Sequence, residues 1–468
     1  MAREISPEEK QTATEMLARA RAAMDAIKDY DQAQIDRLCQ ALGWATGNEK
    51  TFLRIAQMGV DESGIGDRAG RASKRGKIQG VLRDALRQKS VGVVEVDEAK
   101  GLVKYAKPAG VIASLVPTTN PELTPPVTGI YALKAKDAVI FTPHPRSKAT
   151  TFAMVEVMRQ TLKGLGAPED LFQCVAKPSI PLTNELMAIC DLTMATGGKP
   201  MVQAAYSSGR PAFGVGAGNS TIVIDDTADV AEAAQFTRIS KTSDFGSGCS
   251  ADGNMLVDAK HYDAMIEALQ KEGGYLCNDE EKAKLKKVLW DDEGHRRGDT
   301  VAIPAQKIAE LAGFKVPEDC KFIFVRQQEI GPDHKFSSEK LSLVLAVYKF
   351  KDFAECLNMV RAIYEVGGKG HSCGIYSFND DHIDQLARTA PVSRMMVRQP
   401  QSKANAGAFN NGMPMTSSLG CGVWGGNITN ENISLKHYMN LTWVSRPIAE
   451  DRPSEQELFG EFYGTATL

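Results

Sequence analysis

The stretch DLTMATGGKPMVQAAYSSG, residues 191–209, changes its pattern in the middle. Its first part is an apolar run typical of a buried strand, and Gly197 and Gly198 end that run. Its second part starts at Pro200 and continues with Met, Val and Ala, which favours a helix. A strand that leads into a helix through glycines is the repeating unit of a parallel sheet, so this stretch points to an α/β fold.

The same unit recurs on both sides of this stretch. Upstream, the β-rich runs GVIASLVP and KDAVIFTP flank a helix-like segment, residues 122–135, and LFQCVAKP is a further strand. Past Thr242 the pattern starts again with the strand NMLVD, two helical segments and the strands FIFV and LVLAVYKF. We therefore predict two doubly wound α/β domains, the second beginning near residue 241, with ligands at the carboxyl ends of strands.

The composition is that of an ordinary globular protein. Hydrophobic residues make up 43% of the chain, charged residues make up 24%, and the formal net charge is -3. This balance predicts small-molecule partners, because it offers no attraction for nucleic acid or for a membrane surface. We expect a cytoplasmic protein, since no apolar run is long enough to span a bilayer and the first residues do not resemble a signal peptide.

One cysteine has unusual neighbours. Cys249 lies in SDFGSGCSADGN, where Gly246 and Gly248 permit close approach of the backbone and the serines leave the sulfur accessible. Two interpretations stay open: a nucleophile whose pKa falls from about 8.5 through nearby positive charge, or a cysteine packed in a turn. The nine cysteines show no CxxC spacing or histidine clusters, so neither a disulfide framework nor a metal site is expected.

Three loops at the ends of predicted strands hold polar candidates. Asn120, in VPTTNPELTP, either donates its amide N–H to an oxygen that becomes negative or forms a turn. Arg146, in FTPHPRSK, either reaches a ribose phosphate or is solvated. The glycine pair after the strand DLTMAT either offers helix N–H groups to a phosphate or makes a turn without a ligand.

The run RAGRASKRGK, residues 68–77, holds five positive charges without aromatic residues between them. We interpret it as a solvated helix face. Contact with a nucleotide phosphate is the alternative.

Taken together, several motifs resemble the CoA-acylating branch of the aldehyde dehydrogenase superfamily in their order and intervals. They are VPTTNP, FTPHPRSK, ATGGKPMVQAAYSSGRPAFGVGAGNS, the Cys249 loop, EKLSLVLAVYKF, GKGHSCGIYS and LGCGVWGGN. The resemblance implies an NAD(P)-binding domain over residues 1–240, a catalytic cysteine domain over 241–430 and a C-terminal return over 431–468. It also implies a small β arm, formed by residues 97–108 and the C-terminal return, that joins subunits into a homodimer or homotetramer.

The resemblance further implies a reaction. Cys249 would attack an aldehyde to give a thiohemiacetal, and the amide of Asn120 and the Cys249 backbone N–H would hold its oxyanion. Hydride would then pass to NAD or NADP. The cofactor residues implied are Thr142, Pro143, His144 and Arg146 for adenosine, Thr196, Gly197 and Gly198 for pyrophosphate, and Glu339 for the nicotinamide ribose.

One departure from the family pattern concerns water. Hydrolytic members carry a glutamate that activates water, and this chain has Val215 at that place. Coenzyme A would therefore release the acyl group as a thioester, because its thiol is a better nucleophile than water. His371, in GKGHSCG, either assists coenzyme A or has a structural hydrogen bond.

The choice of aldehyde depends on Arg398, which precedes a proline where acetaldehyde and succinate-semialdehyde members tend to have an asparagine-type residue. A cation that faces the substrate favours an anionic aldehyde, and the hydroxyls of Ser247 and Ser250 could donate to a sulfonate. Sulfoacetaldehyde is thus the first expectation, and an Arg398 that faces solvent or another subunit is the alternative. Rival activities are acylating oxidation of succinate semialdehyde or acetaldehyde, a hydrolytic dehydrogenase, a phosphate-dependent reductase and a silent binding protein.

Overall fold

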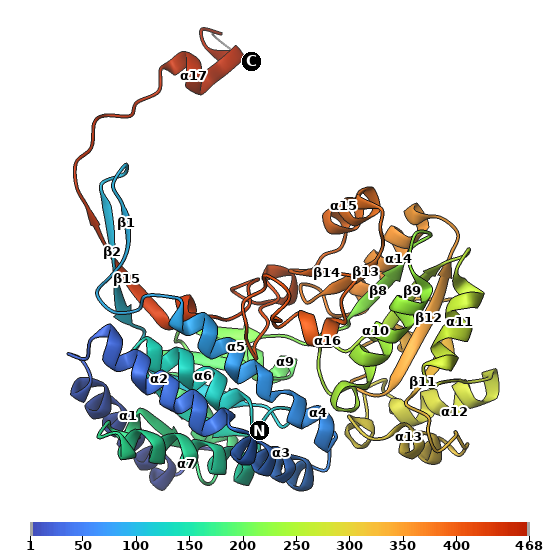
Figure 1. Ribbon diagram of the computed structural model, residues 1–468, viewed down its shortest axis with the longest axis horizontal. Coiled ribbons are helices and arrows are strands. Elements are labelled where there is room, and N and C mark those ends of the chain that lie inside the picture. The colour runs from blue at the N-terminus through green and yellow to red at the C-terminus, as the bar shows by residue number, and fades with distance from the viewer. Residues whose placement is uncertain (1–2, 466–468) are drawn as a thin grey trace.

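The structure is a computed structural model that describes residues 3–465. It contains three sheets, and Figure 1 shows two α/β bodies side by side with a ribbon of strands that rises from one of them. The predicted fold class is therefore confirmed. Among residues 3–465, no helix combines the length and the apolar character needed to cross a bilayer.

The first body begins with helices. Ser6 caps the first of them in a capping box with Glu9, as its sequence favours. The helices are α1 Pro7–Ala26, α2 Gln32–Gly47, α3 Glu49–Ser63, α4 Arg68–Ser73 and α5 Arg75–Leu86.

The sheet of the first body has five parallel strands in the order β5-β4-β3-β6-β7. Its two central strands are buried along their whole length because helices cover both faces. The strands are β3 Val111–Val116, β4 Ala138–Pro143, β5 Phe172–Cys174, β6 Leu192–Thr196 and β7 Ala212–Val215. The helices between them are α6 Thr124–Lys134, α7 Lys148–Gly164, α8 Ile180–Ile189 and α9 Lys199–Tyr206. Since the strand order reverses between β3 and β6, the carboxyl ends of these two strands flank the crevice where such sheets bind ligands.

The second body has seven parallel strands in the order β10-β11-β12-β9-β8-β13-β14. They are β8 Thr221–Ile224, β9 Asn254–Asp258, β10 Gly274–Leu276, β11 Phe322–Arg326, β12 Val344–Phe350, β13 Cys373–Tyr376 and β14 Met395–Val397. Its helices are α10 Val230–Thr242, α11 Tyr262–Lys271, α12 Asp279–Leu289, α13 Ala305–Ala312, α14 Phe353–Val366, α15 Asp380–Thr389 and α16 Gln401–Ala404. Because β8 pairs with β9 and β13, the sheets divide between β7 and β8, earlier than the predicted boundary at 241.

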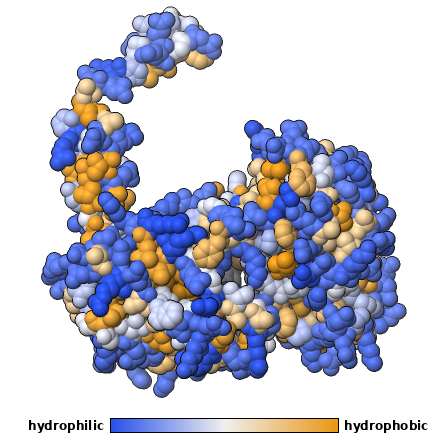
Figure 2. Space-filling view, in the orientation of Figure 1, coloured by the Kyte–Doolittle hydropathy of each residue, from blue (hydrophilic) through white to orange (hydrophobic). Residues whose placement is uncertain are grey.

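A three-stranded antiparallel sheet forms the ribbon seen in Figure 1. It joins β1 Val93–Asp97, β2 Leu102–Pro108 and β15 Met439–Ser445, so the C-terminal segment returns to the predicted arm. Apolar side chains are exposed along it, including Val96, Tyr105 and Trp443, and Figure 2 shows this apolar surface. A tail with the short helix α17 Glu455–Phe459 follows. Subunit association through this arm stays a prediction.

One connection brings the two parallel sheets together. The chain leaves the carboxyl end of β7 at Val215 and enters the amino end of β8 at Thr221. The carboxyl edge of the five-stranded sheet therefore meets the amino edge of the seven-stranded sheet. The candidate functional site lies at this junction.

Candidate active site

Two of the predicted site residues meet directly. Cys249 lies in the loop before β9 and is half-buried, and His371 lies in the loop before β13 and is buried. The Nε2 atom of His371 is 3.0 Å from the Cys249 sulfur. Because β9 and β13 both flank β8 in a parallel sheet, their preceding loops reach the same edge. The sequence analysis predicts that His371 assists coenzyme A or has a structural role, but it does not predict a direct contact with the Cys249 thiol.

The ionisation of this pair is set by burial. Burial, with smaller effects of Glu339 and Cys421, raises the pKa of the Cys249 thiol to about 12. Burial and the charge of Arg394 lower the pKa of His371 to about 3. Near neutral pH the pair is therefore a protonated thiol beside a neutral imidazole, and an imidazole in this form can accept the proton.

A chain of hydrogen bonds selects the tautomer of His371. The Ser220 hydroxyl donates to the Cys249 carbonyl oxygen at 3.2 Å, so in its 3.1 Å contact with Ser372 it must accept. The Ser372 hydroxyl therefore donates its single proton to Ser220. Its oxygen accepts from the Nδ1 of His371 at 2.9 Å and from the Asn405 amide. The ring proton is therefore on Nδ1, and the Nε2 lone pair faces the thiol.

Arg394 contacts the backbone of His371 and is not among the site residues predicted from the sequence. Its guanidinium is buried and donates to the carbonyl oxygens of His371 at 2.9 Å and Gly420 at 2.6 Å. Its charge also acts to lower the pKa of Cys249, although burial outweighs this effect. An arginine just before a short strand gives no sequence signal of this kind.

Glu339 lies near the Cys249 loop, and its predicted contact with the nicotinamide ribose stays a prediction. Its carboxylate accepts from the Gly218 N–H at 2.9 Å and from Arg296 at 3.1 Å. A side chain at Gly218 would collide with the Cys249 carbonyl group, so glycine permits this close approach. Burial raises the pKa of Glu339, and each of its oxygens accepts one hydrogen bond, which leaves the carboxylate able to accept from a further donor.

The position of the missing glutamate is apolar. Val215 ends β7 and is buried in the core of the first body. It offers no base for a water molecule. The apolar surroundings of Val215 are consistent with the expectation that this position does not activate water.

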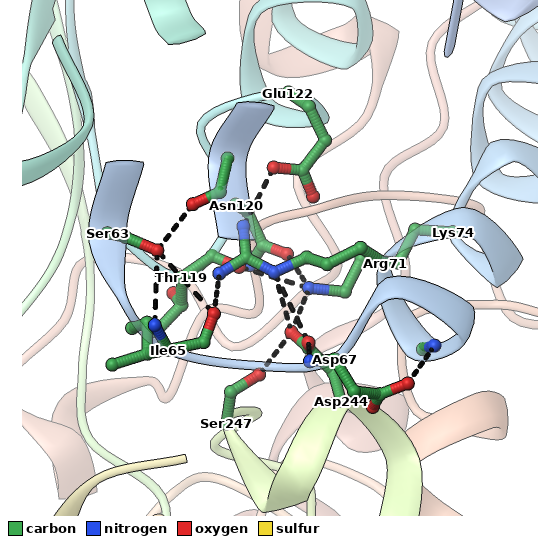
Figure 3. Close-up of polar contacts among 12 residues, drawn as sticks. Ser63, Ile65, Asp67, Arg71, Lys74, Thr119, Asn120, Glu122, Asp244 and Ser247 are labelled. Carbon is green, nitrogen blue, oxygen red and sulfur yellow. Dashed lines mark hydrogen bonds and ion pairs between the residues drawn. The ribbon is translucent and has the colours of Figure 1, made fainter. Parts of the chain in front are cut away.

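Asn120 follows β3 and belongs to a buried polar network, drawn in Figure 3. Its side-chain oxygen accepts from Lys74 at 2.7 Å, and Lys74 also pairs with Asp244 at 2.7 Å. Asp244 in turn accepts from Ser247, two residues before Cys249, at 2.6 Å. The network thus connects the Asn120 loop to the Cys249 loop.

The predicted sulfonate donors need a correction. The single hydroxyl proton of Ser247 is held by Asp244, so it is not free for a substrate. Ser250 is buried, and its hydroxyl acts on Cys249, where it is a small influence that lowers the thiol pKa. Neither serine is placed as an exposed donor.

Arg398 does not lie at the site. It follows the carboxyl end of β14, whereas Cys249 precedes the amino end of β9, so the two residues are at opposite edges of the sheet. Its guanidinium forms a bidentate pair with Glu232, both contacts at 2.8 Å, and stacks on Phe378. The prediction that this arginine faces the aldehyde is therefore corrected.

We expect Arg398→Gln to keep kcat/KM for sulfoacetaldehyde within about twofold, because its partner is Glu232 and not the substrate. The thermal midpoint should fall slightly, since a stacked bidentate pair is lost. Steady-state kinetics and thermal unfolding measure both effects. A large rise in KM for anionic aldehydes alone would instead support the prediction that Arg398 binds the substrate anion.

The residues predicted to bind adenosine and pyrophosphate lie at or just after the carboxyl ends of β4 and β6, on both sides of β3. The Thr142 hydroxyl is buried and has no hydrogen-bond partner within residues 3–465, and Gly198 precedes α9 with an extended backbone. Thr196 contacts Ser418 at 3.1 Å. These features suit a dinucleotide, since a hydroxyl without a partner lies at the end of β4 and a helix begins after β6.

The adenosine-side loop departs from expectation at Arg146. Its backbone N–H donates to His144 at 3.1 Å, and its guanidinium donates to the Ser63 carbonyl oxygen at 2.6 Å. Burial lowers the pKa of His144. Arg146 therefore caps the end of α3 with one of its five donors, and its contact with a phosphate stays a prediction.

A family model described as "Aldehyde dehydrogenase family" matches residues 3–276. A sulfoacetaldehyde dehydrogenase from an Acholeplasma species is 43% identical over 95% of this chain and 93% of its own length. An acylating sulfoacetaldehyde dehydrogenase from Bilophila wadsworthia is 39% identical, over 97% and 98% respectively. An acetylating succinate-semialdehyde dehydrogenase from Clostridium kluyveri is 37% identical, over 95% and 98%.

Solved structures agree in fold over nearly the whole chain. An acetylating aldehyde dehydrogenase from Geobacillus thermoglucosidasius superposes with a TM-score of 0.92 at 32% identity, covering 96% of this chain and 99% of that one. A propionaldehyde dehydrogenase from Rhodopseudomonas palustris, solved with CoA and an acylated cysteine, gives a TM-score of 0.82 at 25% identity, covering 93% and 97%.

Proposed function

Because this chain belongs to the acylating branch of the aldehyde dehydrogenase family, we propose that Cys249 is the nucleophile of a CoA-acylating dehydrogenase for a small anionic aldehyde. The observation that carries the proposal is the 3.0 Å contact between the Cys249 thiol and the neutral imidazole of His371. Val215 stands at the position of the family's water-activating glutamate and supplies no base. Sulfoacetaldehyde is the proposed substrate.

In the first step the Cys249 sulfur bonds to the aldehyde carbon while His371 Nε2 takes the thiol proton. The carbonyl oxygen becomes an oxyanion and needs donors. Within residues 3–465, neither the Cys249 backbone N–H nor the side-chain N–H groups of Asn120 donate a hydrogen bond. Both are therefore available to this oxygen.

The nicotinamide cofactor, NAD or NADP, would occupy the crevice at the ends of β4 and β6 and supply a hydride acceptor. Thr142 and Gly198 would hold its adenosine and pyrophosphate parts, and Glu339 its nicotinamide ribose. Loss of hydride leaves an acyl thioester on Cys249. The low pKa of His371, about 3, lets its ring release the first proton to solvent.

Coenzyme A then completes the turnover as the second substrate. His371, neutral again, takes the CoA thiol proton, and the CoA sulfur attacks the acyl carbon. The bond to Cys249 breaks, and the departing thiolate recovers the proton from His371. Overall, one aldehyde and one CoA give one acyl-CoA, one hydride for the oxidised cofactor and one proton for the solvent.

Partly buried lysines support an anionic substrate. Lys403 contacts the hydroxyl of Ser243 at 2.9 Å, next to Asp244, and Lys77 contacts backbone carbonyl oxygens. Within residues 3–465 neither ammonium forms an ion pair with a carboxylate. Burial lowers both pKa values, that of Lys77 to about 8, and repulsion from a neighbouring cation adds to each effect, from Lys403 on Lys77 and from Lys74 on Lys403. A substrate anion would relieve this repulsion.

The test compares sulfoacetaldehyde, succinate semialdehyde and acetaldehyde, each with CoA, with phosphate and with neither. We expect sustained NAD(P)H formation only with CoA, and kcat/KM at least about tenfold higher for sulfoacetaldehyde than for acetaldehyde. Without CoA, NAD(P)H should stop at one equivalent per subunit. Steady turnover without CoA would indicate a hydrolytic enzyme, turnover with phosphate a reductase of the acyl-phosphate type, and preference for acetaldehyde would end the anionic proposal.

A further inference from the structure

We propose that Lys74 is a positioning residue that sets the orientation of the Asn120 amide. It would turn the amide N–H groups toward the oxygen of the thiohemiacetal. This inference rests on the proposed function, in which Asn120 is an oxyanion donor. Figure 3 shows the side chains that carry it.

The contacts of the Lys74 ammonium fix the orientation of the Asn120 side-chain amide. Its ammonium contacts the side-chain oxygen of Asn120 at 2.7 Å, the carbonyl oxygen of Thr119 at 3.0 Å and a carboxylate oxygen of Asp244 at 2.7 Å. An ammonium has three donors and no acceptor, so all three are used and the amide atom that it touches must be oxygen. The N–H groups of Asn120 then point away from Lys74.

Asp244 fixes the ammonium in turn. Its buried carboxylate also accepts from the Asp67 N–H at 3.0 Å, from Arg71 and from Ser247. Burial acts to raise its pKa, but Lys74 and Arg71 hold the pKa below its usual value. Asp244 has a φ of 50°, in the left-handed region, so this non-glycine residue is strained and its partners stabilise the conformation.

Two glycines of the α4 segment make this approach possible. A side chain at Gly66 would collide with the Asp244 carboxylate, and one at Gly70 would collide with its backbone nitrogen. The segment that carries Lys74 therefore fits closely around Asp244.

Arg71 holds the other side of the same loop. It is fully buried, pairs with Glu122 at 2.8 Å and contacts the Asp244 carboxylate at 3.1 Å. Because Glu122 lies two residues after Asn120, the loop is held at both ends by cations from α4 and its C-terminal end. The positive charge beside the amide oxygen also polarises the amide and strengthens its N–H donors.

Lys74→Met tests the proposal, since it keeps the length of the side chain and removes its donors. We expect kcat to fall about 100-fold, the size of effect of losing one oxyanion donor, with KM for sulfoacetaldehyde and for acetaldehyde changed less than about threefold. Lys163→Met, which removes an exposed ammonium, is the matched control. Lys74→Gln keeps two of the three donors on its amide nitrogen and should lose less; it also serves if the methionine variant unfolds.

A double-mutant cycle with Asn120→Ala separates positioning from a structural role. In the Asn120→Ala background, Lys74→Met should lower kcat less than about threefold further, because no amide remains to be oriented. Fully additive losses would overturn the proposal, as would a rise in KM for anionic aldehydes at unchanged kcat, which would mean that Lys74 binds the substrate. Unchanged kcat in Asn120→Ala alone would reject the role of Asn120, whereas CoA-independent turnover of the unmodified protein would reject the proposed function itself.

Discussion

Cys249→Ala should lower NAD(P)H formation from sulfoacetaldehyde and CoA by at least about 10⁴-fold, because the covalent route then has no nucleophile. Within residues 3–465, Cys249 is the thiol whose sulfur contacts His371, the proposed base. The measurement is the initial rate of absorbance change at saturating CoA. The fold should be unaffected, since alanine removes one atom from a half-buried position.

The matched control is Cys174→Ala. Cys174 is also half-buried, but it ends β5 in the other sheet, so its loss should leave the rate within about twofold. Mass spectrometry of the unmodified protein, mixed with aldehyde and oxidised cofactor without CoA, should find the acyl group on Cys249. Activity above about one percent in Cys249→Ala, or an acyl group on another cysteine, would contradict the assignment.

His371→Ala should lower kcat by about 10²-fold to 10⁴-fold, the usual contribution of a general base. Its pH profile should also change shape. In the unmodified protein the imidazole, with a pKa of about 3, stays a base from pH 5 to pH 9, so its protonation does not limit the rate in this window. In the variant only the thiolate attacks, and with a thiol pKa of about 12 its population rises about tenfold per pH unit between pH 7 and pH 9.

His382→Gln is the control for this prediction. His382 stacks on Phe353 and contacts Asp225, which follows the carboxyl end of β8, away from the Cys249 loop. Its loss should leave both the rate and the pH profile unchanged. Parallel pH profiles for His371→Ala and the unmodified protein would mean that His371 does not take the proton.

One sequence-based prediction is wrong because it rests on local spacing alone. The basic run 68–77 is predicted to be a solvated face, yet Arg71 is fully buried and Lys74 contacts Asn120. A cation can be buried only where carboxylates and carbonyl oxygens meet it, and its partners Glu122 and Asp244 lie far away in the sequence. The spacing of charges within the run therefore cannot reveal these partner carboxylates.

The alternation of strands and helices, the glycine-rich setting of Cys249 and the apolar residue at 215 could be predicted without a structure, because periodicity and residue type are local properties. The order of the strands in each sheet, and thus which loops meet at one edge, could not be predicted in this way. This arrangement placed His371 against Cys249 and sent Arg398 to the opposite edge of the sheet. The physical reason is that parallel strands gather all of their amino ends at one edge, so residues far apart in the chain become neighbours only once the strand order is set.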